Sequence, residues 1–169
     1  MATTYEAIAT VTVGSGGAAN IEFTSIAADW TDLLLKLSGR TNKAQKQENI
    51  QLYFNTSNSN FSFKMLIGDG SAATSYGTTN SQVADVPAAT MTANTFGNME
   101  IYIPNYAGSN NKSFSVDSVD EGNQTTVYSY LTAGLWSQTA AITGIKIAPA
   151  GANNFVQYST ATLYGIKNS

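Results

Sequence analysis

The sequence predicts an all-β protein, an antiparallel β-sandwich of jelly-roll-like form with about ten strands and no significant helix. Apolar residues recur at every second position from Tyr5 to Ile166, which is the period of a strand with one buried face. Gly, Ser, Thr and Asn clusters interrupt this alternation at short intervals, as in sandwiches and barrels. The 169 residues suit one domain, 1–169, with a short N-terminal arm at Met1–Tyr5.

The first two strands are expected in residues 5–13 and 20–24, where apolar and polar side chains alternate. The segment Gly14-Ser15-Gly16-Gly17 lies between them. Glycine adopts the backbone angles of tight turns at little cost, so this segment predicts a turn. We therefore expect these two strands to form a hairpin.

Residues 32–40 require a choice between a helix and a strand. Leucine favours helices, but Leu33, Leu35 and Leu37 would share one face of a strand, and Gly39 lies inside the pattern. Regular alternation is typical of a half-buried strand, and glycine weakens a helix. The prediction here is a strand.

Most of the remaining chain continues the alternation. Further strands are expected at residues 49–55, 61–67, 81–86, 96–103, 112–119, 125–136, 142–148 and 155–166. Residues 68–79 are small, polar and rich in glycine, which predicts a long loop. Gly134, inside the long strand expected at residues 125–136, predicts a β-bulge.

The composition limits the chemistry that the chain could perform. It contains no histidine and no cysteine, and so lacks the commonest general base, the strongest side-chain nucleophile and the usual zinc ligands. The absence of disulfides fits assembly in a reducing cytoplasm. We expect no catalytic residues, no cofactor and no enzymatic activity.

The densest acidic cluster is Asp117, Asp120 and Glu121. Oxygen ligands this close in sequence are weak candidates for calcium binding. Their spacing is not that of an EF-hand, and a polar strand end followed by a Gly-Asn turn explains them equally well. No metal site is therefore predicted.

A carbohydrate-active enzyme is a disfavoured alternative. Paired carboxylates can hydrolyse a glycan. The aromatic residues that could stack on sugars include Tyr53, Tyr102, Tyr106, Trp136 and Tyr158. Aromatic residues on strands are more often packing residues. None of the 11 acidic residues stands out as a catalytic pair.

The charge pattern argues against nucleic acid and membrane partners. Only 11% of the residues are charged, the net charge is −3, and the one basic cluster is Arg40, Lys43 and Lys46. Nucleic acid binding usually needs a larger basic surface. No apolar run approaches the roughly 20 residues that span a bilayer, and the first residues do not resemble a signal peptide.

Three aromatic residues are candidates for partner contacts. Trp30 and Tyr106 lie in expected loops, and Trp136 ends an expected strand. Large aromatic side chains on a surface with few charges often anchor protein contacts. Packing within the core or a loop is the alternative for each.

Several stretches resemble small virion proteins of tailed bacteriophages, especially those of aquatic and cyanobacterial phages. The resemblance extends over most of the chain. It is carried by Phe23-Thr24-Ser25-Ile26 with Thr31-Asp32-Leu33-Leu34-Leu35, by Asn94–Phe114 with Thr95-Phe96-Gly97-Asn98 and Ile101-Tyr102-Ile103-Pro104-Asn105-Tyr106, and by Phe155–Ala161 with Leu163-Tyr164-Gly165-Ile166.

The resemblance implies a non-enzymatic structural protein. Its first implication is a capsid decoration (cement) protein, made in the host cytoplasm, that binds the major capsid protein on the outer capsid surface and stabilises the head as a homotrimer. The alternative is a tail or head fibre component that recognises host surface glycan.

Overall fold

A computed structural model of the chain describes residues 4–124 and 127–167. In this part of the chain every regular element is a strand, which confirms the all-β prediction. The strands are β1 (Tyr5–Thr12), β2 (Ile21–Phe23), β3 (Asp32–Gly39), β4 (Gln47–Phe54), β5 (Phe61–Gly68), β6 (Ala73–Thr78), β7 (Gln82–Pro87), β8 (Gly97–Pro104), β9 (Lys112–Val119), β10 (Ser129–Trp136), β11 (Ile145–Pro149) and β12 (Thr160–Ile166).

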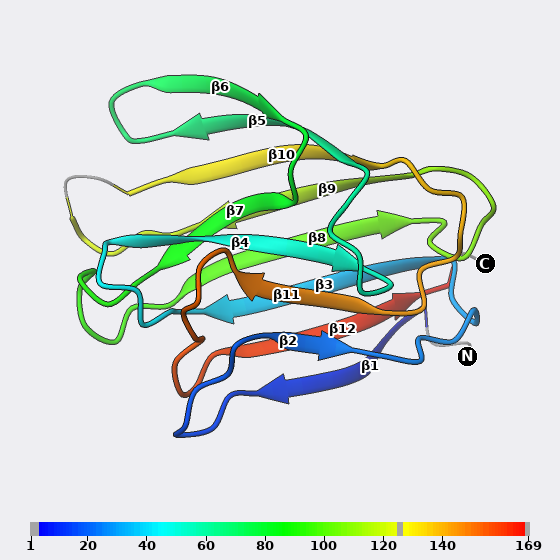
Figure 1. Ribbon diagram of the computed structural model, residues 1–169, viewed down its shortest axis with the longest axis horizontal. Coiled ribbons are helices and arrows are strands. Elements are labelled where there is room, and N and C mark those ends of the chain that lie inside the picture. The colour runs from blue at the N-terminus through cyan, green and yellow to red at the C-terminus, as the bar shows by residue number, and fades with distance from the viewer. Residues whose placement is uncertain (1–3, 125–126, 168–169) are drawn as a thin grey trace.

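The strands form two antiparallel sheets that pack face to face (Figure 1). The larger sheet has eight strands in the order β1-β12-β3-β8-β9-β10-β5-β6, and the smaller has four in the order β2-β11-β4-β7. Alternating side chains of both sheets point into the space between them, as in a β-sandwich. The predicted sandwich is confirmed.

Strands from the two ends of the chain pair in a nested way. β1 pairs with β12, β2 with β11, β3 with β8, and β4 with β7. The strands β9, β10, β5 and β6 then extend the larger sheet beyond β8. Distant parts of the sequence therefore meet in both sheets.

The predicted first hairpin is wrong. β1 and β2 follow each other in sequence but belong to different sheets, and the glycine turn carries the chain from one layer to the other. β1 instead pairs with β12, where Tyr5 stacks on Tyr164 with ring centroids 4.8 Å apart. Long-range packing, rather than the local turn, selects the partner.

The predicted loop at residues 68–79 is also wrong, since it contains β6. The turn before β6 is closed by the Asp69 carboxylate, which accepts hydrogen bonds from the Ser71 amide at 2.9 Å and the Ala72 amide at 2.7 Å. These bonds lower the pKa of Asp69. β6 has no apolar alternation of its own and owes its strand form to pairing with β5.

Gly134 does not form a bulge. β10 keeps a continuous register with both neighbours, and Gly134 lies opposite Phe114 and Phe63. A Cβ atom at Gly134 would lie 2.3 Å from the Phe114 ring, so glycine is needed here for space. Two residues of the predicted strand 125–136, positions 125 and 126, lie outside the described residues, as do positions 1–3 of the predicted N-terminal arm.

Aromatic rings fill one end of the core. The Phe54 ring lies 5.4 Å from Phe61, 5.5 Å from Phe114 and 5.4 Å from Trp136, measured between centroids. The edge-to-face arrangement of several of these pairs is favourable beyond the area that they bury. This cluster joins β4 of the smaller sheet to three strands of the larger one.

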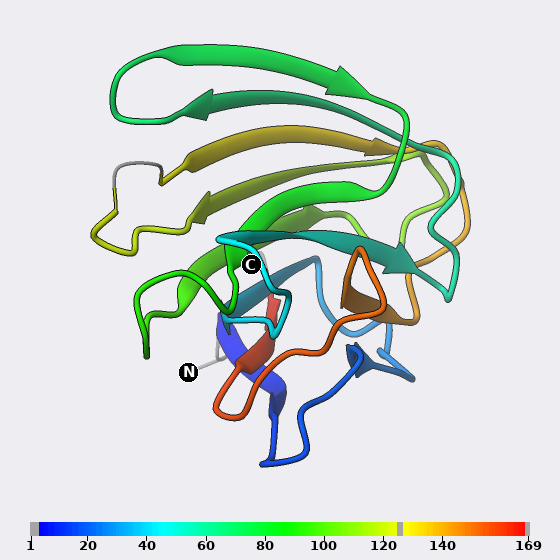
Figure 2. The same cartoon turned by 60° about the vertical axis from the view of Figure 1, so that its left-hand side comes forward.

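The larger sheet extends past the smaller one at β5 and β6. The edge strand β7 lies against β9 and β10, where the hydroxyls of Ser118 and Thr132 donate to the carbonyls of Asp85 at 3.3 Å and Val83 at 3.1 Å. β6 and the end of β5 lie beyond this edge (Figures 1 and 2). All of β6 except Thr78 is exposed, so this strand is not covered by the second layer.

Candidate functional site

The structure does not gather the weak calcium candidates into a site. Asp117 is exposed on β9, Asp120 is buried, and exposed Glu121 accepts a hydrogen bond from the Asn123 amide at 2.5 Å. Within residues 4–124 and 127–167, no three His, Cys, Asp or Glu side chains are placed to hold a metal ion.

Asp120 instead holds neighbouring segments of the chain together through hydrogen bonds. Its carboxylate accepts hydrogen bonds from the Gln47 side chain and the Tyr128 amide, both at 2.5 Å. Burial nevertheless raises the pKa of Asp120, and the nearby carboxylate of Asp85 adds to this effect. Asp120 thus links β4, the end of β9 and the segment before β10.

Two of the three aromatic contact candidates are core residues. Tyr106 is 0% exposed, and its hydroxyl donates a hydrogen bond to the carbonyl of Ala27. Trp136 is 3% exposed and packs in the aromatic cluster with Phe54 and Phe61. Neither side chain is available to a partner, because the inner faces of the two sheets enclose them both.

Trp30 is half-buried and lies flat against the backbone of β12. A Cβ atom at Gly165 would lie 2.1 Å from its ring, so glycine makes this contact possible. The Lys167 ammonium lies 4.8 Å from the Trp30 ring centroid, in the range of a cation–π contact. Of the three candidates, Trp30 alone retains exposed surface.

The basic cluster of the sequence is divided in the structure. The Arg40 guanidinium turns inward and donates to the carbonyls of Met91 at 3.0 Å, Thr92 at 2.8 Å and Thr95 at 2.9 Å. Lys43 pairs with Glu48 at 3.1 Å. Arg40 therefore fixes the connection between β7 and β8.

Exposed apolar side chains surround the β5–β6 hairpin. Leu66 is 51% exposed and lies directly opposite Leu131, which is 58% exposed, across β5 and β10. Tyr76 of β6 is 56% exposed and points to the opposite face of the sheet. We call Leu66 and Leu131 the hairpin surface; large apolar side chains exposed side by side commonly mark interaction sites.

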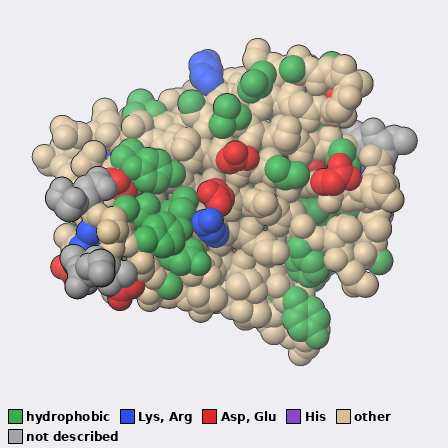
Figure 3. All heavy atoms as spheres, turned by 180° about the vertical axis from the view of Figure 1, so that it is seen from behind, with side chains coloured by type: hydrophobic (Ala, Val, Ile, Leu, Met, Phe, Trp, Pro, Cys, Tyr) green, Lys and Arg blue, Asp and Glu red, His purple; other side chains and the backbone are tan. Residues whose placement is uncertain are grey.

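A second apolar patch lies near the chain ends on the outer face of the larger sheet (Figure 3). The register places Tyr164, Leu34 and Tyr102 side by side on β12, β3 and β8, and Tyr5 stacks on Tyr164. We call these residues the tyrosine patch. The Tyr102 hydroxyl donates to Asp32 at 2.8 Å, and this bond raises the pKa of Tyr102.

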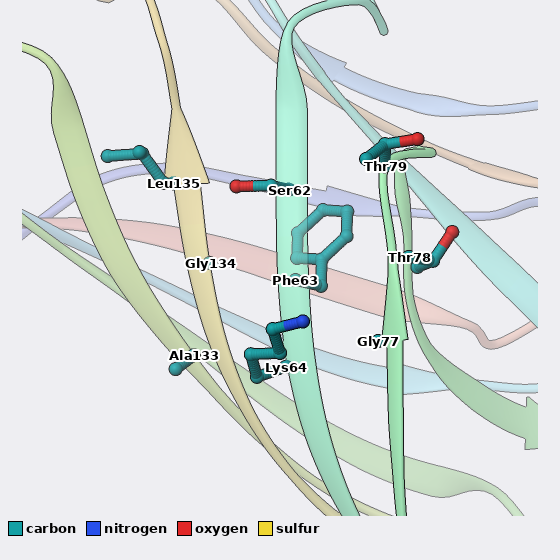
Figure 4. A pocket seen from close by; sticks show the side chains of 9 residues that line it. All are labelled: Ser62, Phe63, Lys64, Gly77, Thr78, Thr79, Ala133, Gly134 and Leu135. Atoms are coloured by element: carbon teal, nitrogen blue, oxygen red, sulfur yellow. The ribbon is translucent and has the colours of Figure 1, made fainter.

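A shallow trough crosses the outer face between β10 and β6 (Figure 4). Lys64 on β5 is flanked by Ala133 on one side and Gly77 on the other. These residues leave a hollow of about 370 Å³. The Lys64 side chain leans over Gly77 towards the outer edge of β6, since a Cβ atom there would be 2.7 Å from its Nζ atom.

A groove of about 220 Å³ lies on the other face, between β6 and the edge strand β7. Tyr76 and Met65 form one wall, and Gln82 and Asp85 contribute polar groups. The Tyr130 hydroxyl donates to Asp85 at 2.6 Å, and burial raises the pKa of Tyr130. The groove thus combines an aromatic ring with amide and carboxylate groups.

The sequence contained a signal for the hairpin surface, but the choice of aromatic residues as contact candidates missed it. In β5, Phe61, Phe63 and Met65 alternate on the buried face, and Leu66 stands on the face that is otherwise polar. A large apolar residue out of phase in a strand indicates an exposed contact. Tyr76 carried no such signal, because β6 was not expected as a strand.

The described residues contain no helix long and apolar enough to cross a membrane. No protein-family model matches the chain, and no curated protein matches it. Among solved structures, the chain is similar to the Clostridium perfringens CspB protease, with 8% identity over 89% of this chain and 26% of that chain, and a TM-score of 0.15. This chain spans about a quarter of that protease, and a likeness at this level carries no argument about fold or activity.

Proposed function

We propose that the protein is a structural component of a bacteriophage virion, a decoration protein that binds the outer capsid surface and stabilises the head. The main support is the hairpin surface, with Leu66 and Leu131 exposed side by side. A partner that covers these side chains would gain the free energy of removing them from water, about 25 cal/mol per Å².

The architecture is consistent with this proposal. The nested pairing of β1 with β12, β2 with β11, β3 with β8 and β4 with β7 supports a jelly-roll order, which recurs in viral capsid domains. The outer face of the larger sheet offers the hairpin surface, the trough and the tyrosine patch on one side of the molecule. Weak contacts of this kind reinforce one another when a lattice repeats them.

The first test is the copy number of the chain in purified virions, measured by mass spectrometry against the major capsid protein. A copy number comparable with that of the capsid protein supports decoration, a small number supports a tail or fibre part, and absence contradicts both. Purified expanded capsids should then bind the protein and melt at a higher temperature.

Matched variants connect this test to the site. The double variant Leu66→Ser with Leu131→Ser should abolish capsid binding, while Tyr158→Ser should leave it unchanged. Tyr158 is 69% exposed, and it lies in the connection before β12 rather than at the hairpin. Equal binding by both variants would exclude the hairpin surface as the capsid contact.

The groove between β6 and β7 supports a second candidate function, recognition of host surface glycan by a fibre component. Aromatic rings with adjacent planar amide and carboxylate groups are suited to stacking on sugar rings and bonding their hydroxyls. Tyr76, Gln82 and Asp85 supply these groups. A glycan array should give a signal that Tyr76→Ala removes; silence of the wild-type protein on a broad array would contradict this candidate.

A further inference from the structure

We propose that β6 is a self-pairing edge: two copies of the chain join their β6 strands antiparallel about a two-fold axis at Ser75. The result is one continuous sheet with eight strands from each copy. Such self-pairing is independent of the virion role, because it depends on the edge alone.

The four outer strands of the two sheets differ in how they are protected. β1 carries Glu6 and a register shift between Ala7 and Ala9, and β2 has three residues with exposed Glu22 at the centre. The β7 edge is covered by side chains from β9 and β10. Charges, irregularities, short length and cover are the usual protections against edge pairing.

Within its own residues, β6 has none of these protections. Its six residues follow one regular register with β5 from Ala73 to Thr78. No charged residue occurs anywhere in residues 70–84, so two copies of this edge can approach without like-charge repulsion. An exposed, regular and uncharged edge strand is a template for pairing with another strand.

The hydrogen bonds of the neighbouring strands show which β6 groups face outward. The Asp69 amide bonds the Ala72 carbonyl at 3.1 Å, and the Ser137 amide bonds the Asn60 carbonyl at 2.8 Å. Hydrogen-bonded pairs alternate along antiparallel ladders. The first bond makes Asp69 and Ala72 a bonded pair of the β5–β6 ladder, so every second residue of β6 from there, Thr74, Tyr76 and Thr78, bonds to β5. The second bond gives the same result, because it assigns the alternate residues of β5 to β10. The amides and carbonyls of Ala73, Ser75 and Gly77 therefore point away from the sheet.

This outward set is self-complementary. A two-fold axis at Ser75 places Ser75 opposite Ser75 of the second copy, and Ala73 opposite Gly77. Three hydrogen-bonded pairs give about six new backbone hydrogen bonds. On the inner face, the exposed ring of Tyr76 falls opposite Thr74 of the second copy, an aromatic–β-branched pair of the kind that stabilises sheets.

The shape of the sandwich leaves room for the second copy. β6 lies beyond the edge of the smaller sheet (Figure 2), so the smaller sheets of the two copies stay apart. A six-residue ladder buries less than the roughly 800 Å² per partner of a standard interface. We therefore expect a reversible dimer whose population rises with concentration.

Sedimentation velocity and light scattering on the purified chain, over a wide range of concentrations, test the proposal. The wild-type protein should shift from monomer to dimer as concentration increases. Ser75→Pro should lower the association constant at least tenfold, because proline removes an outward amide that β5 does not use. Ser75→Thr retains this amide and is the matched control; circular dichroism verifies that both variants fold.

A charge-swap experiment locates the axis. Ser75→Lys and Ser75→Glu should each be monomeric, because like charges then lie directly opposite each other. Mixing the two variants should restore a one-to-one heterodimer. A wild-type monomer at every concentration, a trimer, or a dimer that survives Ser75→Pro would overturn the proposal.

Discussion

β1 and β6 are the two outer strands of the same sheet, yet their inner faces have different surroundings. Ile8 and Val11 of β1 pack against the core. The corresponding Tyr76 of β6 is 56% exposed. Both strands are hydrogen-bonded to a neighbour on one side. The difference therefore shows that cover by the second sheet, rather than strand pairing, determines whether the inner face of an edge strand is buried within one chain.

The largest expected effect distinguishes the covered part of the larger sheet from the exposed strand β6. Phe114→Ala should lower the free energy of unfolding by about 3–5 kcal/mol, because it removes a buried ring that contacts Phe54, Phe61 and Phe63. Tyr76→Ala should change it by less than about 0.5 kcal/mol. Urea denaturation measures both; similar losses would mean that Tyr76 and β6 contribute to the core.

Two glycines provide a finer test of the same comparison. Gly134→Ala should destabilise the fold by about 1–3 kcal/mol, since its Cβ atom would collide with the enclosed Phe114 ring. Gly77→Ala should be nearly neutral, because the only close atoms belong to the mobile end of Lys64. Thermal melting of the pair checks this; a larger loss at Gly77 would reveal a constraint on the hairpin.

Asp120 makes the covered part sensitive to pH. Its raised pKa means that the folded chain retains a proton that the unfolded chain releases. This contribution is fully present below the ordinary Asp pKa and is lost as pH rises through the raised value. The melting temperature of Asp120→Asn, minus that of the wild-type protein, should therefore increase as pH rises through this window. A difference that does not change with pH would contradict this prediction.

The smallest expected effect is an alternation in amide exchange along β6. The amides of Ala73, Ser75 and Gly77 should exchange faster than those of Thr74, Tyr76 and Thr78 in dilute protein, because they face outward. High protein concentration should slow the first set selectively. Uniform exchange along β6 at all concentrations would contradict both the register and the pairing.

The period of apolar residues was sufficient to predict the layered β architecture and most strands. It predicted β3 correctly against the helix preference of leucine, because Leu33, Leu35 and Leu37 all face the core. It missed β6, whose residues have no period of their own and are ordered by β5. The period also could not predict which strands pair, as the wrong prediction of a β1–β2 hairpin shows, because pairing depends on contacts far apart in sequence.

The candidate site was less predictable than the fold. Tyr106 and Trp136 have the residue type of interface anchors, but an aromatic residue on a strand looks the same in sequence whether it faces inward or outward. Arg40 belongs to the basic cluster of the sequence, yet it is buried and bonds backbone carbonyls, as does Lys112. Side-chain direction follows from the position of the second sheet, which the local pattern does not contain.

The pairing of β1 with β12 also affects how the chain acquires its structure. Tyr5 pairs with Ile166 in the register, so the first strand remains without its partner until β12 has left the ribosome. At about 5–20 residues per second, synthesis outlasts most local folding events. Assembly of the larger sheet is therefore expected to wait for β12 and to be slow, as in other proteins of high contact order.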